Sequence, residues 1–569
     1  MITRLRVYTL LFIVFFIVLL IRLFYWQIYN GSNLSAEART QYKQGRSLSA
    51  QRGEILASDG SWLVASGQSW LIYASIPNLK NDPKKIAEKL APILIESEDR
   101  KDILEEIDRI TSLLQKKDIV WISLKSRISD DIKNKIDELK IEGIGFEPVE
   151  SRIYPEGSSS AQILGFVGKD DEGNDKGYFG IEGFYDLPLS GKPGFISRDA
   201  DASGIPIILG SSREVSAIKG VNLSTHIDKS VQFSIEKKLK KGIEQYGAVS
   251  GTVIVMDPKQ GSILGMSSIP SYDPSRYWEY GDTFFNNPAI FSSFEPGSIF
   301  KVLIMAAGID AGVIKPETIC DVCSGPYRID KYSIETWNNQ YHPNSTMVDV
   351  IVNSDNVGMT FVGEKLGPQM MFEYLTKFKI GEPTGIDLQG EISPKLREKD
   401  SWSIVDVATA SFGQGIAVTP IQMIRAVAAI ANGGVIRRPQ VVEKIVGDGW
   451  EDVINNDSAE RVISEKAANE VTLMMAEAAS RGESKWTYKK GFRVAGKTGT
   501  AQIPIAGHYD EEKTNASFIG FAPYNDPKFV MLVTLQEPST SPWASETAAP
   551  LWYSIAGDLF TYFGIQPEN

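Results

Sequence analysis

A serine and a lysine three residues apart are the side chains in this sequence best suited to nucleophilic catalysis. Ser298-Ile-Phe-Lys301 follows Glu295-Pro-Gly297, and Ser298 opens an apolar stretch that predicts a helix over residues 299–309. Residues three apart on a helix share a face, so the lysine amine can approach the serine hydroxyl. Burial lowers the pKa of a lysine and leaves a neutral amine that can accept the serine proton. The Ser298 N–H, at the head of the helix, has no intrahelical acceptor and can donate to an oxyanion.

Two further motifs distinguish this pair from chance matches. Ser216–Lys219 and Ser234–Lys237 have the same spacing, and we expect both to be exposed surface. The Ser298 pair is followed, in order, by Ser354-Asp355-Asn356 and by Lys497-Thr498-Gly499-Thr500. The three motifs together are typical of serine β-lactamases and penicillin-binding proteins.

Other kinds of catalytic centre find less support. His226, His342 and His508 are the only histidines, and none belongs to an H-E-x-x-H motif, so we expect neither a metal site nor a cofactor. No G-x-S-x-G nucleophile elbow occurs. Cys320 and Cys323 are the only cysteines, and they predict a local disulfide or two ordinary thiols in preference to a zinc or redox site.

One rival motif overlaps the last block. Gly491-Phe-Arg-Val-Ala-Gly-Lys497-Thr498 matches the phosphate-binding loop pattern G-x-x-x-x-G-K-[ST]. The lysine of such a loop opens a helix that holds phosphate at its N-terminus. Gly499 and Pro504 disfavour a helix after Lys497, and residues 492–495 are typical of a strand. A strand is therefore favoured over a nucleotide site.

The N-terminus predicts a membrane anchor. Residues 7–21 are uncharged and apolar, and after Arg22 the apolar character continues to Ile28, enough to span a bilayer core of ~30 Å. Arg4 and Arg6 favour a cytoplasmic N-terminus, which places the rest of the chain outside the plasma membrane. A cleaved signal peptide is the alternative, but no small-x-small cleavage site follows the run. The net charge of -12 argues against a nucleic-acid partner.

The length of 569 residues predicts more than one domain. We assign residues 1–30 to a cytoplasmic tail and transmembrane helix, 31–220 to a stalk and non-catalytic pedestal, and 221–569 to the catalytic domain. In the pedestal, residues 70–74 are typical of a strand, and residues 84–95 and 99–116 are typical of helices.

The catalytic domain is predicted to be an α+β fold with one antiparallel sheet assembled from both of its chain ends. Its predicted elements are a hairpin of residues 251–256 and 262–266, helices to about residue 490, strands at 492–503, 516–522 and 529–535, and a last helix at 549–563. Helices are expected on both faces of this sheet.

Several blocks of the sequence, in order, resemble those of the class B penicillin-binding proteins. The blocks are Arg52-Gly-Glu-Ile-Leu-Ala-Ser-Asp-Gly60, Arg152-Ile-Tyr-Pro-Glu-Gly157, Ile163-Leu-Gly-Phe-Val-Gly168, Gly180-Ile-Glu-Gly183, Phe294-Glu-Pro-Gly-Ser-Ile-Phe-Lys301, Gly413-Gln-Gly-Ile-Ala-Val-Thr-Pro-Ile-Gln422 and Val494-Ala-Gly-Lys-Thr-Gly-Thr-Ala-Gln502. Three residues depart from the family pattern: Ala57-Ser58 replaces Asp-Arg, and Asp355 stands where the family often has serine.

The resemblance implies a peptidoglycan D,D-transpeptidase carried on a pedestal. Ser298 would attack the D-Ala-D-Ala bond of one stem peptide and pass the acyl group to an amine on a neighbouring strand, and β-lactams would acylate the same serine. The residue roles that the resemblance implies are Lys301 as general base, Ser354 as proton relay, Asn356 on the substrate amide, Lys497 on the terminal carboxylate, Thr498, Gly499 and Thr500 in substrate binding, and the N–H groups of Ser298 and Thr500 as the oxyanion hole.

The short stalk, Tyr327-Arg-Ile-Asp330 and Gly564-Ile-Gln-Pro567 are more similar to the cell-division members than to the rod-elongation members, which determine cell shape. The resemblance also implies a polytopic membrane glycosyltransferase and other division proteins as partners. Two alternatives are a membrane-anchored β-lactamase or carboxypeptidase that deacylates to water, and a non-catalytic β-lactam sensor or division scaffold.

Overall fold

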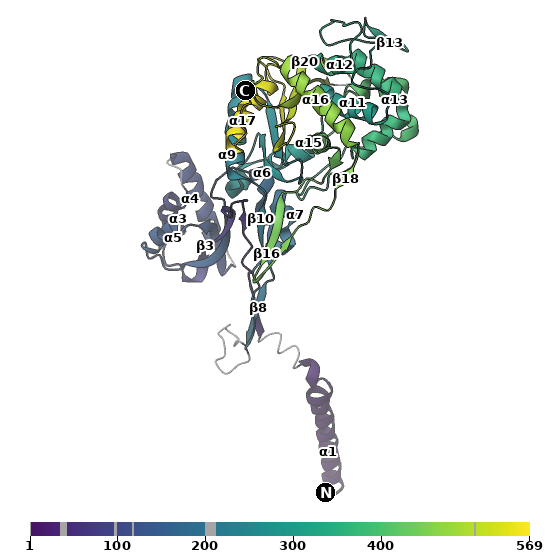
Figure 1. The fold of residues 1–569 in the computed structure, drawn as a ribbon. Coiled ribbons are helices and arrows are strands. Elements are labelled where there is room, and N and C mark those ends of the chain that lie inside the picture. The colour runs from purple at the N-terminus through teal and green to yellow at the C-terminus, as the bar shows by residue number, and fades with distance from the viewer. Residues whose placement is uncertain are drawn as a thin grey trace. The chain divides into compact units, whose positions relative to one another are not determined.

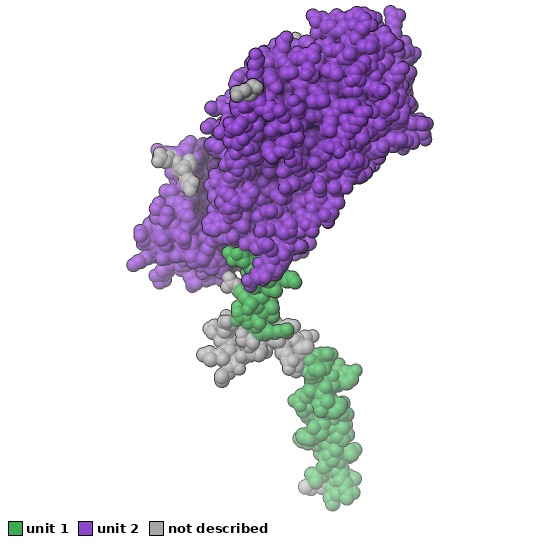
Figure 2. Space-filling view, in the orientation of Figure 1, with its two compact units in different colours: residues 1–52, 190–220 green, residues 53–189, 221–569 purple. Residues whose placement is uncertain are grey.

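The computed structural model describes residues 2–34, 43–95, 99–116, 119–199, 212–505 and 508–568 (Figure 1). The chain divides into two compact units, which Figure 2 colours separately. One unit holds residues 1–52 and 190–220, and the other holds residues 53–189 and 221–569. The domain boundaries given above, at residues 30 and 220, stay predictions.

The smaller unit contains the apolar N-terminal helix. Helix α1 (Ile2–Phe24) continues into the π-helical turn η1 (Tyr25–Tyr29), and the side chains of both are exposed. The helical span Ile2–Tyr29 contains an 18-residue window with a mean hydropathy of 2.8, and it is long and apolar enough to cross a membrane. The unit also holds a three-stranded antiparallel sheet in the order β1 (Lys43–Leu48), β8 (Gly194–Asp199) and β9 (Ser212–Val215).

The larger unit begins with the pedestal sheet. Its long strand β3 (Trp62–Ser75) pairs with β2 (Ile55–Leu56), β4 (Trp121–Ile128) and β5 (Ile144–Ile153). Helices α3 (Pro83–Leu94), α4 (Arg100–Leu114) and α5 (Asp130–Asp137) bury their apolar residues against this sheet. The predicted strand at residues 70–74 and both predicted helices are confirmed.

Strands from the second half of the chain complete the same sheet. Its order is β17-β16-β10-β2-β3-β4, where β10 is Asn222–Thr225, β16 is Val442–Gly447 and β17 is Trp450–Val453. Residues 442–453, which the sequence placed inside a helical region, therefore form a hairpin of the pedestal sheet. Shorter elements nearby are α6 (Ala161–Leu164), β6 (Phe166–Lys169), β7 (Asp175–Tyr178), α7 (Gly180–Phe184), β15 (Val435–Ile436) and β18 (Glu460–Arg461).

A buried ion pair joins two of the pedestal blocks. The Arg152 guanidinium lies 2.6 Å from Glu182 Oε1, and the two side chains are only 6% and 0% exposed. Arg152 also donates to the Gly53 carbonyl at 2.7 Å and to Ser66 Oγ at 2.6 Å. Removing one partner of such a pair leaves an uncompensated buried charge.

We expect Arg152→Ala to lower the free energy of unfolding by about 3–5 kcal/mol, since it removes a buried cation that lies 2.6 Å from the buried Glu182 carboxylate. Urea unfolding of the detergent-solubilised chain measures the loss. Lys80→Ala is the matched control, because Lys80 and Glu142 form a pair that is 75% and 59% exposed and such pairs contribute little. Equal losses for both variants would contradict the expectation.

The catalytic sheet has the predicted construction. It is antiparallel throughout, in the order β12 (Ile263–Ile269), β11 (Ser250–Met256), β21 (Phe529–Gln536), β20 (His508–Ala522) and β19 (Ala495–Ile505). The hairpin and the three late strands are confirmed. Strand β19 begins at Ala495, not at Phe492, because Phe492 lies in a turn and stacks on Phe560 at 4.3 Å between ring centroids.

Alternate residues of each strand face different layers of helices. On β11, Val253 and Val255 pack with α9 (Lys229–Tyr246) and the last helix α17 (Ala548–Tyr562), whereas Ile254 and Met256 pack in the other core. That second core contains the helices of the middle region (Figure 1): α10 (Pro288–Phe291), α11 (Lys301–Asp310), α12 (Met347–Val352), α13 (Asn356–Lys377), α14 (Ile404–Ser411), α15 (Pro420–Ala431) and α16 (Glu465–Arg481). The period of two in the strands thus divides the domain into two layers.

The two cysteines form a local disulfide. Cys320 and Cys323 are bonded to one another and are 1% and 0% exposed. The bridge lies before the small hairpin of β13 (Tyr327–Ile329) and β14 (Tyr332–Ile334). Of the two interpretations that the sequence left open, the disulfide is confirmed.

Candidate active site

Ser298 lies in a 3-10 turn that leads into α11. The turn η5 covers Gly297–Ile299, and the α-helix itself begins at Lys301, two residues after the predicted start at Ile299. Gly297 causes the difference: its φ is +54°, a conformation that suits glycine, and its N–H donates to the Gly413 carbonyl at 3.0 Å. Residues three apart also share a face in a 3-10 turn, so the approach of the Lys301 amine to the Ser298 hydroxyl stays a prediction that this turn is compatible with.

Lys301 is fully buried at the start of α11. Its Nζ donates to the Ser354 carbonyl at 2.6 Å and to Asn356 Oδ1 at 2.7 Å, and it lies 3.3 Å from Ser354 Oγ. Burial, and after it the positive charge of Lys497, lowers the pKa of Lys301 to about 7, against the attraction of Asp355 and Glu483. A large fraction of the amine is therefore neutral near pH 7.

The middle motif connects α12 to α13. Ser354 has a positive φ of 55°, and Asp355 follows as the N-cap of α13. Asp355 Oδ1 accepts from the N–H groups of Val357 at 2.8 Å and Gly358 at 3.1 Å. Serine and aspartate are both good N-caps, so either residue could cap α13 at this position.

Lys497 contacts the Ser354 hydroxyl from a different element, the strand β19. It lies on β19, is 3% exposed, and donates to Ser354 Oγ at 2.9 Å. Burial lowers its pKa, and the negative charge of Glu483 opposes this shift. Residues Lys497–Thr500 pair with Ile519–Ala516 of β20, so the phosphate-loop alternative, which needs a helix after the lysine, is wrong.

The residues after Lys497 on β19 make further contacts at the same site. Thr498 Oγ1 donates to Glu483 Oε2 at 3.1 Å, and Thr500 Oγ1 accepts from the Ala544 N–H at 3.0 Å. Gly499 lies where β19 passes the Ser298 turn. A Cβ there would come within 2.7 Å of Ser517 Oγ and 2.9 Å of Ile299 Cγ2, so the close approach requires glycine.

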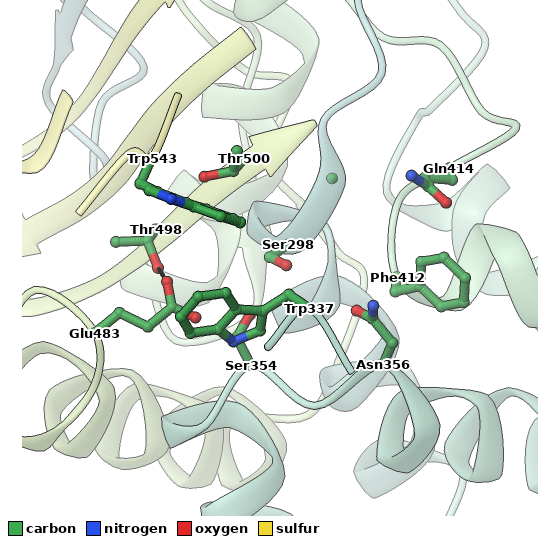
Figure 3. A pocket seen from close by; sticks show the side chains of 11 residues that line it. Ser298, Trp337, Ser354, Asn356, Phe412, Gln414, Glu483, Thr498, Thr500 and Trp543 are labelled. Atoms are coloured by element: carbon green, nitrogen blue, oxygen red, sulfur yellow. Dashed lines mark hydrogen bonds between the residues drawn. The ribbon is translucent and has the colours of Figure 1, made fainter. Parts of the chain in front are cut away.

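These residues surround a pocket of about 470 Å³, its open mouth included. In Figure 3, Thr498, Thr500, Glu483 and Trp543 lie on one side of Ser298, and Phe412 and Gln414 lie on the other. Lys301 and Lys497 contact the lining residues from within the protein. The lining residues are Gly297, Ser298, Trp337, Ser354, Asn356, Phe412, Gln414, Glu483, Thr498, Thr500 and Trp543.

The structure thus brings together all three predicted motifs and adds residues that the sequence did not single out as site residues. Trp337 and Trp543 lie with their ring centroids 5.0 Å apart at the pocket, and Glu483 follows α16. Gln414 belongs to the family-like block of residues 413–422, so the sequence did contain a signal that could have marked it as a site residue. No motif marked the two tryptophans or Glu483. Among the residues that the structure describes, no group of three or more His, Cys, Asp or Glu is placed to hold a metal ion.

Comparison with known proteins gives matches along nearly the whole chain. Residues 251–557 match the family model described as penicillin binding protein transpeptidase domain, and residues 47–225 match the penicillin-binding protein dimerisation domain. Stage V sporulation protein D of Bacillus subtilis is 30% identical over 563 residues, covering 98% of this chain and 85% of that protein. Peptidoglycan D,D-transpeptidase FtsI of Buchnera aphidicola is 29% identical, with 98% and 94% covered. The crystal structure of penicillin binding protein 2X from Streptococcus thermophilus aligns with a TM-score of 0.73 at 24% identity, over 92% of this chain and 80% of that one.

Proposed function

This chain belongs to the class B penicillin-binding proteins, and we propose that it cross-links peptidoglycan as a membrane-anchored D,D-transpeptidase with Ser298 as its nucleophile. The observation that carries the proposal is the position of Lys301. Its fully buried amine lies one turn from Ser298 and is held by Ser354 and Asn356 of the second motif. A buried amine of lowered pKa beside a hydroxyl is an activated nucleophile pair.

In the proposed acylation, Lys301 Nζ takes the proton from Ser298 Oγ as that oxygen attacks the carbonyl of the penultimate D-alanine. The N–H groups of Ser298 and Thr500 donate to the oxyanion; β19, which carries Thr500, is an edge strand with backbone groups free to face a ligand. As the C–N bond breaks, Ser354 Oγ passes a proton to the leaving D-alanine amine. Its contacts with both lysines, at 3.3 and 2.9 Å, support this relay.

Substrate binding is assigned to the remaining motif residues. Asn356 would hold the amide of the donor stem peptide, and Lys497 would attract its terminal carboxylate, with Thr498 and Thr500 as hydrogen-bond partners. Gly499 allows the close approach of β19 to the Ser298 turn. The acyl group then passes to an amine of a neighbouring stem peptide, and β-lactams, which resemble D-Ala-D-Ala, acylate Ser298 in the same way.

A fluorescent penicillin tests the proposal on the detergent-solubilised full chain. We expect one covalent label per chain that persists for many minutes, because the natural acceptor is an amine and not water. Loss of the label with continued turnover of the antibiotic would identify a β-lactamase or carboxypeptidase instead. A chain that takes no label would be a sensor or scaffold without acyl-transfer activity.

We further propose that the enzyme works at the division septum, with a cytoplasmic N-terminus and a polytopic glycosyltransferase as partner. Arg4 and Arg6 before the span, and the name of the FtsI relative, support this assignment. The relative named stage V sporulation protein D favours a specialised wall as the second candidate.

One tagged chain tests both parts of this assignment. A fluorescent tag before residue 2 is expected to gather at mid-cell and to resist protease added to spheroplasts. Accumulation along the side wall would indicate an elongation role, and accumulation around a developing spore would indicate the second candidate. Cleavage of the tag would show that the N-terminus lies outside the membrane, contrary to the proposed topology.

A further inference from the structure

Two buried lysines share a single hydroxyl in this site. Lys301 Nζ and Lys497 Nζ lie 3.3 and 2.9 Å from Ser354 Oγ, and both side chains are almost fully buried. Two ammonium groups this close repel strongly where water is excluded. Such a pair titrates as a unit, and over a range of pH it holds one proton. The chemistry then depends on which of the two amines carries that proton.

The surroundings of Lys497 favour the charged form. Its Nζ donates to Thr498 Oγ1 at 3.2 Å, and the same hydroxyl donates to Glu483 Oε2 at 3.1 Å. The hydrogen bonds therefore run from the amine through the hydroxyl to a carboxylate. Figure 3 draws the Thr498–Glu483 contact at the edge of the pocket.

The surroundings of Lys301 suit a neutral amine better. Its two short contacts are to neutral oxygens, the Ser354 carbonyl at 2.6 Å and Asn356 Oδ1 at 2.7 Å. The charged groups that act on it are Lys497 on β19, Asp355 before α13 and Glu483 after α16. The hydrogen-bonded oxygen of Asp355 faces the first N–H groups of α13, so its charge is partly compensated by the helix.

Glu483 is thus the carboxylate connected to one lysine and not to the other. We propose that Glu483 is a positioning residue which, through the Thr498 hydroxyl, holds the single proton of the lysine pair on Lys497. Lys301 is then left as the neutral amine, and Lys497 is the cation that attracts the carboxylate of the substrate or β-lactam. The inference rests on the proposed function, because it assigns the two amines different tasks in the same acylation.

The test is the pH dependence of acylation in Glu483→Gln. The probes are benzylpenicillin, which carries a carboxylate, and its methyl ester, which does not. Without the glutamate charge, Lys497 loses its proton at lower pH. The alkaline limb of the profile, where the acylation rate for benzylpenicillin falls with rising pH, is therefore expected to move down by about one pH unit. At a fixed pH on this limb, the second-order acylation rate for benzylpenicillin would then fall about tenfold. The acylation rate for the methyl ester is expected to fall much less, when the rate in Glu483→Gln is compared with the rate for the same ester on the unaltered chain.

Two further variants separate this role from a structural one. Glu483→Asp keeps the charge, so its alkaline limb is expected to lie close to that of the unaltered chain. Glu477→Gln removes a carboxylate from α16, the helix that precedes Glu483; Glu477 pairs with Arg481, and this change is expected to leave the profile unchanged. If Glu483→Gln does not fold, Thr498→Val, which removes only the connecting hydroxyl, must give the same shift.

An unchanged benzylpenicillin profile in Glu483→Gln would overturn the inference while leaving the proposed function intact. Equal losses for the acid and the ester would overturn it as well, because they would indicate general damage to the site. A chain that takes no label from either probe at any pH would overturn the proposed function and this inference together.

Discussion

Ser298→Ala is expected to abolish covalent labelling by a fluorescent penicillin completely. The substitution removes the attacking oxygen and leaves the rest of the pocket in place. Ser298 is only partly buried and lines the pocket, so an alanine there creates no sizeable cavity. The measurement is in-gel fluorescence after incubation with the probe, with thermal unfolding of the same sample as the check on folding.

Ser234→Ala is the matched control for this result. Ser234 and Lys237 repeat the S-x-x-K spacing on α9, but Ser234 Oγ donates to Asp558 at the surface and has no place in the pocket. Full labelling is expected. Residual labelling of Ser298→Ala that disappears only when another serine is also replaced would assign the nucleophile elsewhere.

Lys301→Ala is expected to slow acylation by a factor of about 10²–10⁴, the usual contribution of a positioned general base. Because burial and Lys497 lower the pKa of Lys301 to about 7, the amine is protonated and inactive below that pH and neutral above it. The acylation rate of the unaltered chain should therefore rise as pH increases through about 7. This rise should be missing in Lys301→Ala.

Stopped-flow acylation between pH 5 and 9 measures both effects. Lys237→Ala, which removes an amine from the surface copy of the motif, is the control and should behave as the unaltered chain. A folded Lys301→Ala protein that acylates at a near-normal rate, or that keeps the rise near pH 7, would assign the base to another group. Lys497 would then be the next candidate, since it contacts the same Ser354 hydroxyl.

Two of the three motifs that meet at the pocket could be predicted from the sequence because they depend on local geometry. Gly297 takes a positive φ, and Asp355 caps a helix. Requirements of this kind are met within a few residues of chain and leave a recognisable pattern. The short, nearly continuous apolar runs of residues 251–256 and 529–535 likewise predicted β11 and β21.

The rest of the site depends on contacts that no local pattern encodes. Trp337 and Trp543 come from segments far apart in the chain and meet only in the folded domain. Glu483 follows the end of α16, and its importance lies in the distance to Thr498, which is 15 residues away. The hairpin of β16 and β17 belongs to the pedestal sheet although helices surround it in the sequence. The start of α11 was misplaced because apolar composition alone does not distinguish a 3-10 turn from an α-helix.

The order of strands in the catalytic sheet also constrains when this protein can fold. Strand β21 lies between β11 and β20, and its residue Gln536 meets Ser250, which is 286 residues earlier. A chain synthesised from its N-terminus onward must therefore wait until almost its entire length has emerged before the sheet can close. During this interval β11 can pair with β12, but its other edge has no partner strand until β21 is available. Topologies dominated by such distant pairings fold slowly. A truncation that removes β21 takes away the middle of the sheet, so even a chain that keeps all three catalytic motifs would lack the frame that brings them together.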